Sequence, residues 1–477
     1  MKRTSIWTND KGIDCQKLEQ DMEVDVLIIG GGITGLSTLL QLQNSNLKVI
    51  LVERNSCGLG VTSRSTAKIT FLQEQIYMNI RTSSIDQASM YLKSQIDAVK
   101  LLKDIITNNH IDCNLQEVSS YLFTNKEKNI AKLEKEYQFL TQNHVKVEKT
   151  KLDEVDNILA LKVDHTYTFH PLKYINYLKK VMKDNIYENS KVEQIDKKDN
   201  YYYVKANDHI IKCKYVVIAT HYPYFLIPFL MPLKSHVETS YIGAKEIKEV
   251  KNMSAINIDK PCISWRYYQD GKKNYLIYLF QSFASCNIKS IESNFDTLKK
   301  QYHFDYIWSN KDIITNDYIP YIGRIYKDDD TFLLASGYNT WGMTNASLAG
   351  KILADIILKK ENPYIDLFAP HRQINFNKII RLPIDIGSSI KAILKSTKEN
   401  VNNSKVIYKK IKGKKVAIYL DHNGKEHIVL NKCPHMKCGL VFNEIEMTWD
   451  CLCHGSRFTI DGKCIEGPSN FDIQFKK

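Results

Sequence analysis

Residues 24–53 read VDVLIIGGGITGLSTLLQLQNSNLKVILVE and decide the fold of the first part of the chain. An apolar run leads into the pattern G-x-G-x-x-G, a leucine-bearing segment follows, and a second apolar run ends at Glu53. The glycines are Gly30, Gly32 and Gly35. This order of strand, glycine loop, helix, strand and acid is typical of a dinucleotide-binding fold. The glycines let the backbone approach a pyrophosphate at the helix N-terminus, and the acid is expected to bind ribose hydroxyls.

The segment after the acid distinguishes between cofactors. Residues 60–68 read GVTSRSTAK and resemble the loop that runs along the flavin in the D-amino acid oxidase and glycine oxidase superfamily. The resemblance continues in FHPL at 169–172, DYIPYIGR at 317–324 and GYNTWGMT at 337–344. It implies bound FAD rather than NAD, a small-molecule substrate, and a helix over about 345–359 that starts at the pyrimidine edge of the flavin.

The two patterns together predict a set of cofactor-binding residues in the glycine loop, after the acid, and at the ends of later strands. They are Gly30, Gly32, Thr34, Gly35, Glu53, Arg54, Thr62, Ser63, Val192, Ala219, Thr220, Gly323, Gly337, Gly342 and Met343. The polar groups expected nearest the flavin ring, and hence the catalytic candidates, are Lys68, His221 and Arg266. Further candidate substrate contacts are the aromatic residues Tyr222, Tyr224, Trp265, Tyr275 and Tyr278.

A second pattern lies near the end of the chain. Cys433-Pro434-His435 is followed after 15 residues by Cys451-Leu452-Cys453-His454. Two thiolates and two imidazoles from two loops suit an iron–sulfur cluster, and the same four ligands also satisfy tetrahedral zinc.

These loops resemble the Rieske [2Fe–2S] family, whose two loops read C-x-H-x-x-C and C-x-C-H-G-S. The resemblance implies that Cys433 and Cys451 bind one iron and that His435 and His454 bind the other. It also pairs Cys438 with Cys453, where some members carry a disulfide that braces the loops. Gly467-Pro468 stands where the family places a third loop that covers the cluster.

The resemblances predict an α/β FAD-binding (Rossmann-like) domain with an interleaved α+β substrate domain, followed by a small all-β Rieske domain. The expected limits are 1–372 for the FAD-dependent oxidoreductase, 373–403 for a basic connector and 404–477 for the Rieske domain. Within the first, the FAD-binding segments are about 20–80, 150–225 and 310–372, and the substrate-domain segments are about 84–150 and 226–309.

Composition bounds the class of protein. The chain has 477 residues, and it contains no run of the ~18 apolar residues that a membrane span requires. A polar start and scattered cysteines without pattern predict a cytoplasmic protein. Of the net charge of +13, a large share lies near the C-terminus, where nine lysines stand between Lys391 and Lys415. These lysines are either a solvated linker or a docking surface for an acidic electron-carrier protein; no nucleic-acid module accompanies them.

We therefore expect a bacterial FAD-dependent oxidoreductase, a dehydrogenase-like enzyme. It would oxidise a small amine, amino acid or similar substrate and pass electrons through a Rieske [2Fe–2S] cluster to a partner. Two alternatives are an FAD oxidase with a structural zinc domain and a non-catalytic redox sensor or adaptor. The sequence leaves open the substrate, the direction of electron flow, the oligomeric state and the oxidation of Cys438 and Cys453.

Overall fold

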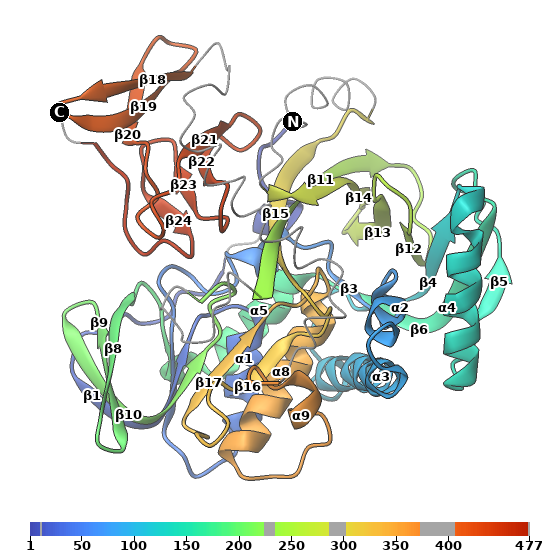
Figure 1. Cartoon of the computed structure of the whole chain (residues 1–477), viewed down its shortest axis with the longest axis horizontal. Coiled ribbons are helices and arrows are strands. Elements are labelled where there is room, and N and C mark those ends of the chain that lie inside the picture. The colour runs from blue at the N-terminus through green and yellow to red at the C-terminus, as the bar shows by residue number, and fades with distance from the viewer. Residues whose placement is uncertain (10–11, 224–233, 286–301, 373–405, 476–477) are drawn as a thin grey trace.

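The computed structural model describes residues 1–9, 12–223, 234–285, 302–372 and 406–475 (Figure 1). Two predictions fall outside these ranges: the candidate contact Tyr224 and the whole connector 373–403. Figure 1 shows the C-terminal strands in red at one end of the molecule, beside β11 and β15 and above the sheet that holds β1 and β10.

The first sheet carries the dinucleotide fold. Its strand order is β16-β17-β10-β1-β2-β7, with β8 and β9 continuing from β10, and the pairs among β17, β10, β1 and β2 are parallel. The strands are β1 (Met22–Ile29), β2 (Val49–Val52), β7 (Ile186–Tyr187), β8 (Val192–Lys198), β9 (Tyr201–Ala206), β10 (His209–Ile218), β16 (Tyr321–Arg324) and β17 (Phe332–Ser336). Strand β2 and the carboxyl ends of β1 and β10 are buried, as parallel strands covered on both faces require.

Helices pack closely against this sheet. Helix α8 begins three residues before the predicted start and crosses α1 so tightly that a Cβ on Gly350 would lie 2.6 Å from the backbone carbon of Ser37. The helices of the first part of the chain are α1 (Ile33–Leu42), α2 (Ile76–Arg81), α3 (Ile85–Asn108), α4 (Ile130–Gln142), α5 (Pro171–Val181), α8 (Gly342–Ile357) and α9 (Ile365–Phe368). Short 3₁₀ helices are η1 (Ile6–Asn9), η2 (Val61–Arg64), η3 (Glu127–Asn129) and η4 (Lys183–Asn185).

The second sheet has the order β15-β11-β14-β13-β12-β4-β6-β3, with β5 paired to β6. Its strands are β3 (Lys68–Ile69), β4 (Gln116–Thr124), β5 (Glu148–Thr150), β6 (Leu159–Thr168), β11 (Ser235–Ile247), β12 (Met253–Asn257), β13 (Ser264–Asp270), β14 (Lys273–Ala284) and β15 (Tyr306–Thr315). Strands β3, β6 and part of β15 come from ranges assigned to FAD-binding segments, so the two halves interleave more finely than the predicted limits.

Two small antiparallel sheets form the C-terminal part. One is β18 (Val406–Ile411), β19 (Lys414–Leu420) and β20 (Glu426–Leu430). The other is β21 (Leu440–Asn443), β22 (Thr448–Cys451), β23 (Arg457–Thr459) and β24 (Cys464–Glu466). The core between them contains Trp449 and Phe458, both fully buried. The two cysteine- and histidine-bearing loops connect β20 to β21 and β22 to β23.

Candidate active site and cluster site

The glycine loop forms one wall of a cavity at the carboxyl ends of β1, β2 and β10. Gly30 has a φ of +112°, and a Cβ there would lie 2.5 Å from the carbonyl oxygen of Ala219. A Cβ on Gly35 would overlap the carbonyl oxygen of Gly30. A Cβ on Gly32 would meet only Thr62 Oγ1, at 3.4 Å. The backbone therefore leaves room for a phosphate group at the N-terminus of α1, a site that favours negative charge.

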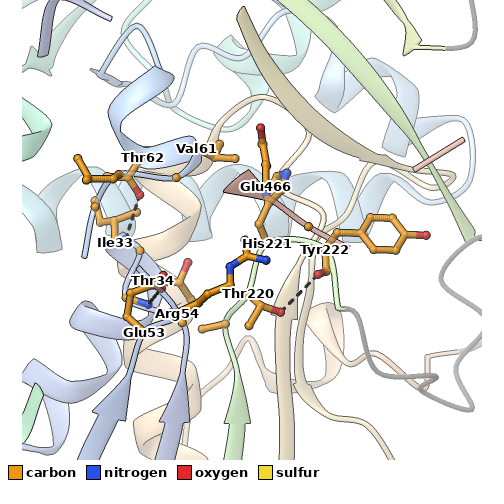
Figure 2. Close-up of a pocket in the computed structure, with 18 of the residues that line it drawn as sticks. Ile33, Thr34, Glu53, Arg54, Val61, Thr62, Thr220, His221, Tyr222 and Glu466 are labelled. Atoms are coloured by element: carbon orange, nitrogen blue, oxygen red, sulfur yellow. Dashed lines mark hydrogen bonds between the residues drawn. The ribbon is translucent and has the colours of Figure 1, made fainter. Parts of the chain in front are cut away.

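Glu53 is held in place at the edge of this cavity (Figure 2). Its Oε2 accepts a hydrogen bond of 2.8 Å from the Gly31 amide, and its Oε1 accepts one of 2.8 Å from the Asn55 amide. Across the cavity, Figure 2 shows Thr220 and His221, with Glu466 above them and the ring of Tyr222 directed outward.

Most of the predicted cofactor-binding residues line this one cavity. They are Gly30, Gly32, Thr34, Glu53, Arg54, Thr62, Val192, Ala219, Thr220, Gly342 and Met343. The other four lie close by without lining it: Gly35, Ser63, Gly323 and Gly337. Gly35 packs α1 on β1, and Ser63 Oγ donates to the carbonyl of Gly60 at 3.0 Å. Gly323, within β16, has a φ of +126°, and Gly337, directly after β17, has a φ of +75°.

A second cavity of about 570 Å³ lies against the first and is bounded by β11, β14 and β15. The two share Ser65, Asn310, Asp312, Thr340, Gly342 and Met343. Glu238 and Asp312 stand directly opposite each other on β11 and β15, so both carboxylates face this space. Burial raises the pKa of Asp312 to about 7. Neither acid was predicted, because their pairing depends on strand register and no motif marks it.

The three catalytic candidates occupy different places. Lys68 lines the second cavity, and its Nζ donates to Ser264 Oγ and, at 3.1 Å, to the carbonyl of Ala255. Burial lowers its pKa to about 7. His221 lines the first cavity, where burial lowers its pKa. Arg266 lines neither; its guanidinium donates to backbone carbonyls, including that of Ala67 at 2.7 Å.

The aromatic candidates for substrate contact do not line the second cavity within the described ranges. Trp265 and Tyr278 stack on each other at 6.4 Å, and Tyr275 stacks on Tyr268 at 6.4 Å, so these rings pack the second sheet. Tyr222 instead belongs to the lining of the first cavity.

The two C-terminal loops bring the predicted cluster ligands together. The Cys433 and Cys451 thiols share a hydrogen bond, which lowers the pKa of Cys433 to about 7 and raises that of Cys451. The His435 and His454 rings lie 5.0 Å apart. Burial lowers the pKa of both histidines, that of His454 to about 3. The loops therefore offer a pair of sulfurs and a pair of neutral imidazoles, the forms that bind metal.

One buried atom tests whether these residues fit a cluster. His454 Nδ1 is buried and has no hydrogen-bond partner in the part of the chain that the structure describes, as expected of an atom that binds metal. A single zinc ion, with bonds of about 2.0–2.3 Å, would need all four ligand atoms close together. Among described residues the four predicted ligands form no such group; Cys451 has Cys438 and Cys453 near it instead. The arrangement thus fits two irons with separate ligand pairs.

The surroundings of the ligands also follow the predicted pattern. Cys438 and Cys453 form a disulfide in the structure. Ser456 accepts a hydrogen bond of 2.8 Å from the Ser469 amide, which joins the third loop to the second. Lys311, which belongs to the oxidoreductase domain, donates a hydrogen bond of 3.1 Å from its Nζ to the Gly455 carbonyl. Each loop is therefore held by contacts outside itself.

Buried charges join the two domains. Arg457 is fully buried; its Nη1 lies 3.0 Å from Glu446 Oε2, and its Nη2 donates to Ser309 Oγ at 2.6 Å. Glu446 also pairs with Arg64, and Lys311 lies 3.2 Å from Asp450. Burial alone would raise the pKa of Asp450, but Lys311 and Arg457 hold it below its usual range.

The third loop reaches the cofactor cavity directly. Gly467 and Asn470 of this loop contribute to its lining, together with Ile465 and Glu466 at the end of β24. Arg54 Nη1 donates to the Ser469 carbonyl at 3.3 Å, and Asn470 Nδ2 donates to the Val192 carbonyl at 3.0 Å. Two predicted cofactor-binding residues, Arg54 and Val192, are thus also interface residues. Sequence order gives no sign of this second role.

Comparison with known proteins agrees with this geometry. Residues 25–356 match the FAD dependent oxidoreductase family, and residues 392–474 match the Rieske [2Fe-2S] domain. The chain belongs to the family of FAD dependent oxidoreductases. It is an enzyme that carries a Rieske domain at its C-terminal end, and these two parts bind FAD and a [2Fe–2S] cluster.

Particular relatives share both parts or one. The Bacillus subtilis protein YhfW, described as a Rieske 2Fe-2S iron-sulfur protein, is 30% identical over 95% of this chain and 93% of its own. Gamma-glutamylputrescine oxidoreductase of Escherichia coli is 23% identical over 77% of this chain and 91% of its own. The crystal structure of glycine oxidase from Geobacillus kaustophilus superposes with a TM-score of 0.59 at 18% identity, covering 74% of this chain and all of that one.

These findings bear on the alternatives. The Rieske match favours the iron–sulfur cluster over a structural zinc site. The relatives include an oxidoreductase that is named for an amine substrate, and they identify neither the substrate nor the electron partner of this chain. None of the helices in the described ranges is both long enough and apolar enough to cross a membrane.

Proposed function

We propose that this chain oxidises a small amine or amino acid at FAD and passes the electrons through the Rieske cluster to a separate, acidic carrier protein. The observation that carries the proposal is the position of the cofactor cavity. It shares six lining residues with the second cavity and is also lined by the third loop of the cluster domain. A substrate and a one-electron acceptor can thus reach the same cofactor from two sides.

The second cavity suits a protonated amine. Glu238 and Asp312 offer two adjacent carboxylates on its wall, and Asn310 stands beside them. These acids would bind the substrate ammonium group before oxidation. Oxidation of R–CH₂–NH₃⁺ to R–CH=NH₂⁺ releases two electrons and two protons. FAD supplies the acceptor for such a pair and can release it one electron at a time.

We assign Lys68 the role of accepting the proton that leaves the substrate nitrogen. Its amine lines the cavity, and its lowered pKa makes the neutral form available near neutral pH. Arg266 would hold the loop of Lys68 through the carbonyls of Thr66 and Ala67. His221 would orient the cofactor from the opposite cavity wall. The residues that bind FAD would be the fifteen predicted above. The residues that bind the cluster would be Cys433, His435, Cys451 and His454.

The remaining proposals concern partner and compartment. Lys409, Lys410, Lys412 and Lys414 are exposed on the β18–β19 hairpin and offer a positive surface to an acidic carrier. Among the described residues, six thiols outside the cluster loops are free, namely Cys15, Cys57, Cys113, Cys213, Cys262 and Cys464. This pattern supports the cytoplasmic placement.

The test is an anaerobic mixing experiment on protein that contains both cofactors. A panel of primary amines, diamines and amino acids is mixed with the protein, while flavin absorbance and the EPR signal of the reduced cluster are recorded. The proposal expects at least one amine to bleach the flavin and then to produce the cluster signal. In Cys433→Ser the flavin should still bleach and the cluster signal should be absent. Flavin that no amine or amino acid reduces, in protein that dithionite does reduce, would refute the proposal.

A further inference from the structure

Tyr222 connects the cofactor cavity to the cluster site. It follows β10 and belongs to the cavity lining, and its ring points outward from that cavity (Figure 2). The ring lies 5.6 Å from the ring of His454 and 6.3 Å from that of His435, measured between centroids. One side chain of the oxidoreductase domain therefore contacts both imidazoles that bind the second iron.

The hydroxyl group of Tyr222 does not explain this position. The side chain is 4% exposed, and Tyr222 Oη has no hydrogen-bond partner among the residues that the structure describes. A buried hydroxyl without a partner is costly, and phenylalanine would avoid the cost. The aromatic ring lies between the cavity and the two histidines. The ring, rather than the hydroxyl group, therefore accounts for the position of this residue.

The contact lies beside an interface of hydrogen bonds and buried charges between strand β15 and the cluster domain. Strand β15 alternates its faces: Asn310 and Asp312 face the cavities, whereas Ser309 and Lys311 contact the cluster domain. A Cβ on Gly455, whose φ is +82°, would lie 3.1 Å from Lys311 Cδ. The second cluster loop thus rests directly on the strand that walls the substrate cavity. Separating the domains would expose these buried charges without their partners.

We infer that electrons pass from the flavin to the cluster through the contact of Tyr222 with His435 and His454, in this docked arrangement and without movement of the Rieske domain. The inference rests on the proposed electron flow from flavin to cluster. A flavin reduced by hydride would give up one electron in each of two transfers to the cluster, and the pair of transfers would release one proton to water. An external one-electron carrier reoxidises the cluster before the second transfer completes the pair.

The experiment starts the transfer without substrate, so that it is independent of amine oxidation. Bound flavin is photoreduced by a light pulse with EDTA as the electron donor, and cluster reduction is followed by freeze-quench EPR. Tyr222→Leu should slow the transfer roughly 10-fold, the low end for groups that contact metal ligands. Tyr222→Phe keeps the ring and should transfer at the parent rate. Midpoint potentials and EPR g values of both variants should match the parent, which a general loss of structure would not allow.

A measurement on the unmodified protein tests the docked arrangement separately. If the Rieske domain stays in place, the transfer rate does not change when sucrose raises the solvent viscosity. A rate that falls in proportion to viscosity would show that the domain moves, and would overturn the inference even if Tyr222→Leu fails to fold. A parent-like rate in a folded Tyr222→Leu protein would overturn the route through the ring. Absence of any cluster reduction after flavin photoreduction would instead refute the electron flow itself.

Discussion

The cofactor cleft and the interface between the two domains are built in different ways. The cleft depends on backbone conformation at glycines such as Gly30 and Gly35, which lie within one stretch of 30 residues. The interface depends on buried charges from distant segments, and Arg64 and Glu446 are 382 residues apart. The glycine loop of the cleft is disrupted by one added methyl group. A charge network assembled from distant segments is sensitive to the loss of one partner.

The largest effect should come from adding a methyl group to the cleft. In Gly35→Ala the new Cβ would overlap the Gly30 carbonyl oxygen, so α1 must move from β1. We expect a loss of more than about 4 kcal/mol in the free energy of unfolding, and loss of bound FAD. Gly32→Ala is the matched control: its Cβ meets only Thr62 Oγ1 at 3.4 Å. That variant should unfold like the parent and bind FAD more weakly, as measured by denaturation and by flavin fluorescence.

The same comparison explains what could be predicted from sequence. The glycine loop, the acid Glu53 and the four proposed cluster ligands each lie in short motifs whose spacing implies their geometry. Tyr222 was expected at the substrate, but its ring faces the cluster histidines because the Rieske domain docks there. Glu238 and Asp312 meet only through the register of β11 and β15. Such contacts arise from long-range pairing and docking, which motifs do not encode.

The next largest effect on stability should come from the loss of one buried charge at the interface. Arg457→Met leaves Glu446 and Asp450 buried beside fewer cations, which should cost about 3–5 kcal/mol in the free energy of unfolding. Because the pKa of Glu446 and of Asp450 is lowered in the fold, the stability they provide is present above about pH 4 and is lost as the pH falls. Denaturation of parent and variant from pH 3 to pH 7 measures both effects.

A double variant provides the control for the interface. Lys311→Met combined with Asp450→Asn removes one cation and one anion together, so it should be less destabilising than Lys311→Met alone. If the single and double variants lose the same stability, the pair does not act as a unit and the interface is held by its apolar contacts instead.

A smaller effect is expected inside the second cavity, the proposed substrate site. If Lys68 accepts the substrate proton, the limiting rate of flavin reduction should rise as the pH passes through about 7, where Lys68 loses its own proton. Cys262, Arg266 and Glu74 are the other ionisable groups near it. Lys68→Met should lower the rate roughly 100-fold at pH 8 and remove the part of the step at pH 7 that Lys68 causes. Any part that remains is due to Asp312, whose pKa is also about 7. Lys260→Met, at an exposed lysine of the same cavity, is the control and should keep the parent profile.

The smallest effect should come from the exposed lysines of the β18–β19 hairpin. Charges at an exposed surface act mainly on the rate of association, and salt screens them over about 10 Å at 0.1 M. Reversing Lys409, Lys410, Lys412 and Lys414 to Glu should therefore slow reduction of an acidic ferredoxin or flavodoxin roughly 10-fold at low salt. Flavin photoreduction and the internal transfer should be unchanged. Reversing Lys432 and Lys437 instead, which are exposed beside His435, separates a docking surface at the hairpin from one at the first cluster loop. If the hairpin variant matches the parent across a salt series, these lysines are a solvated surface and the carrier docks elsewhere.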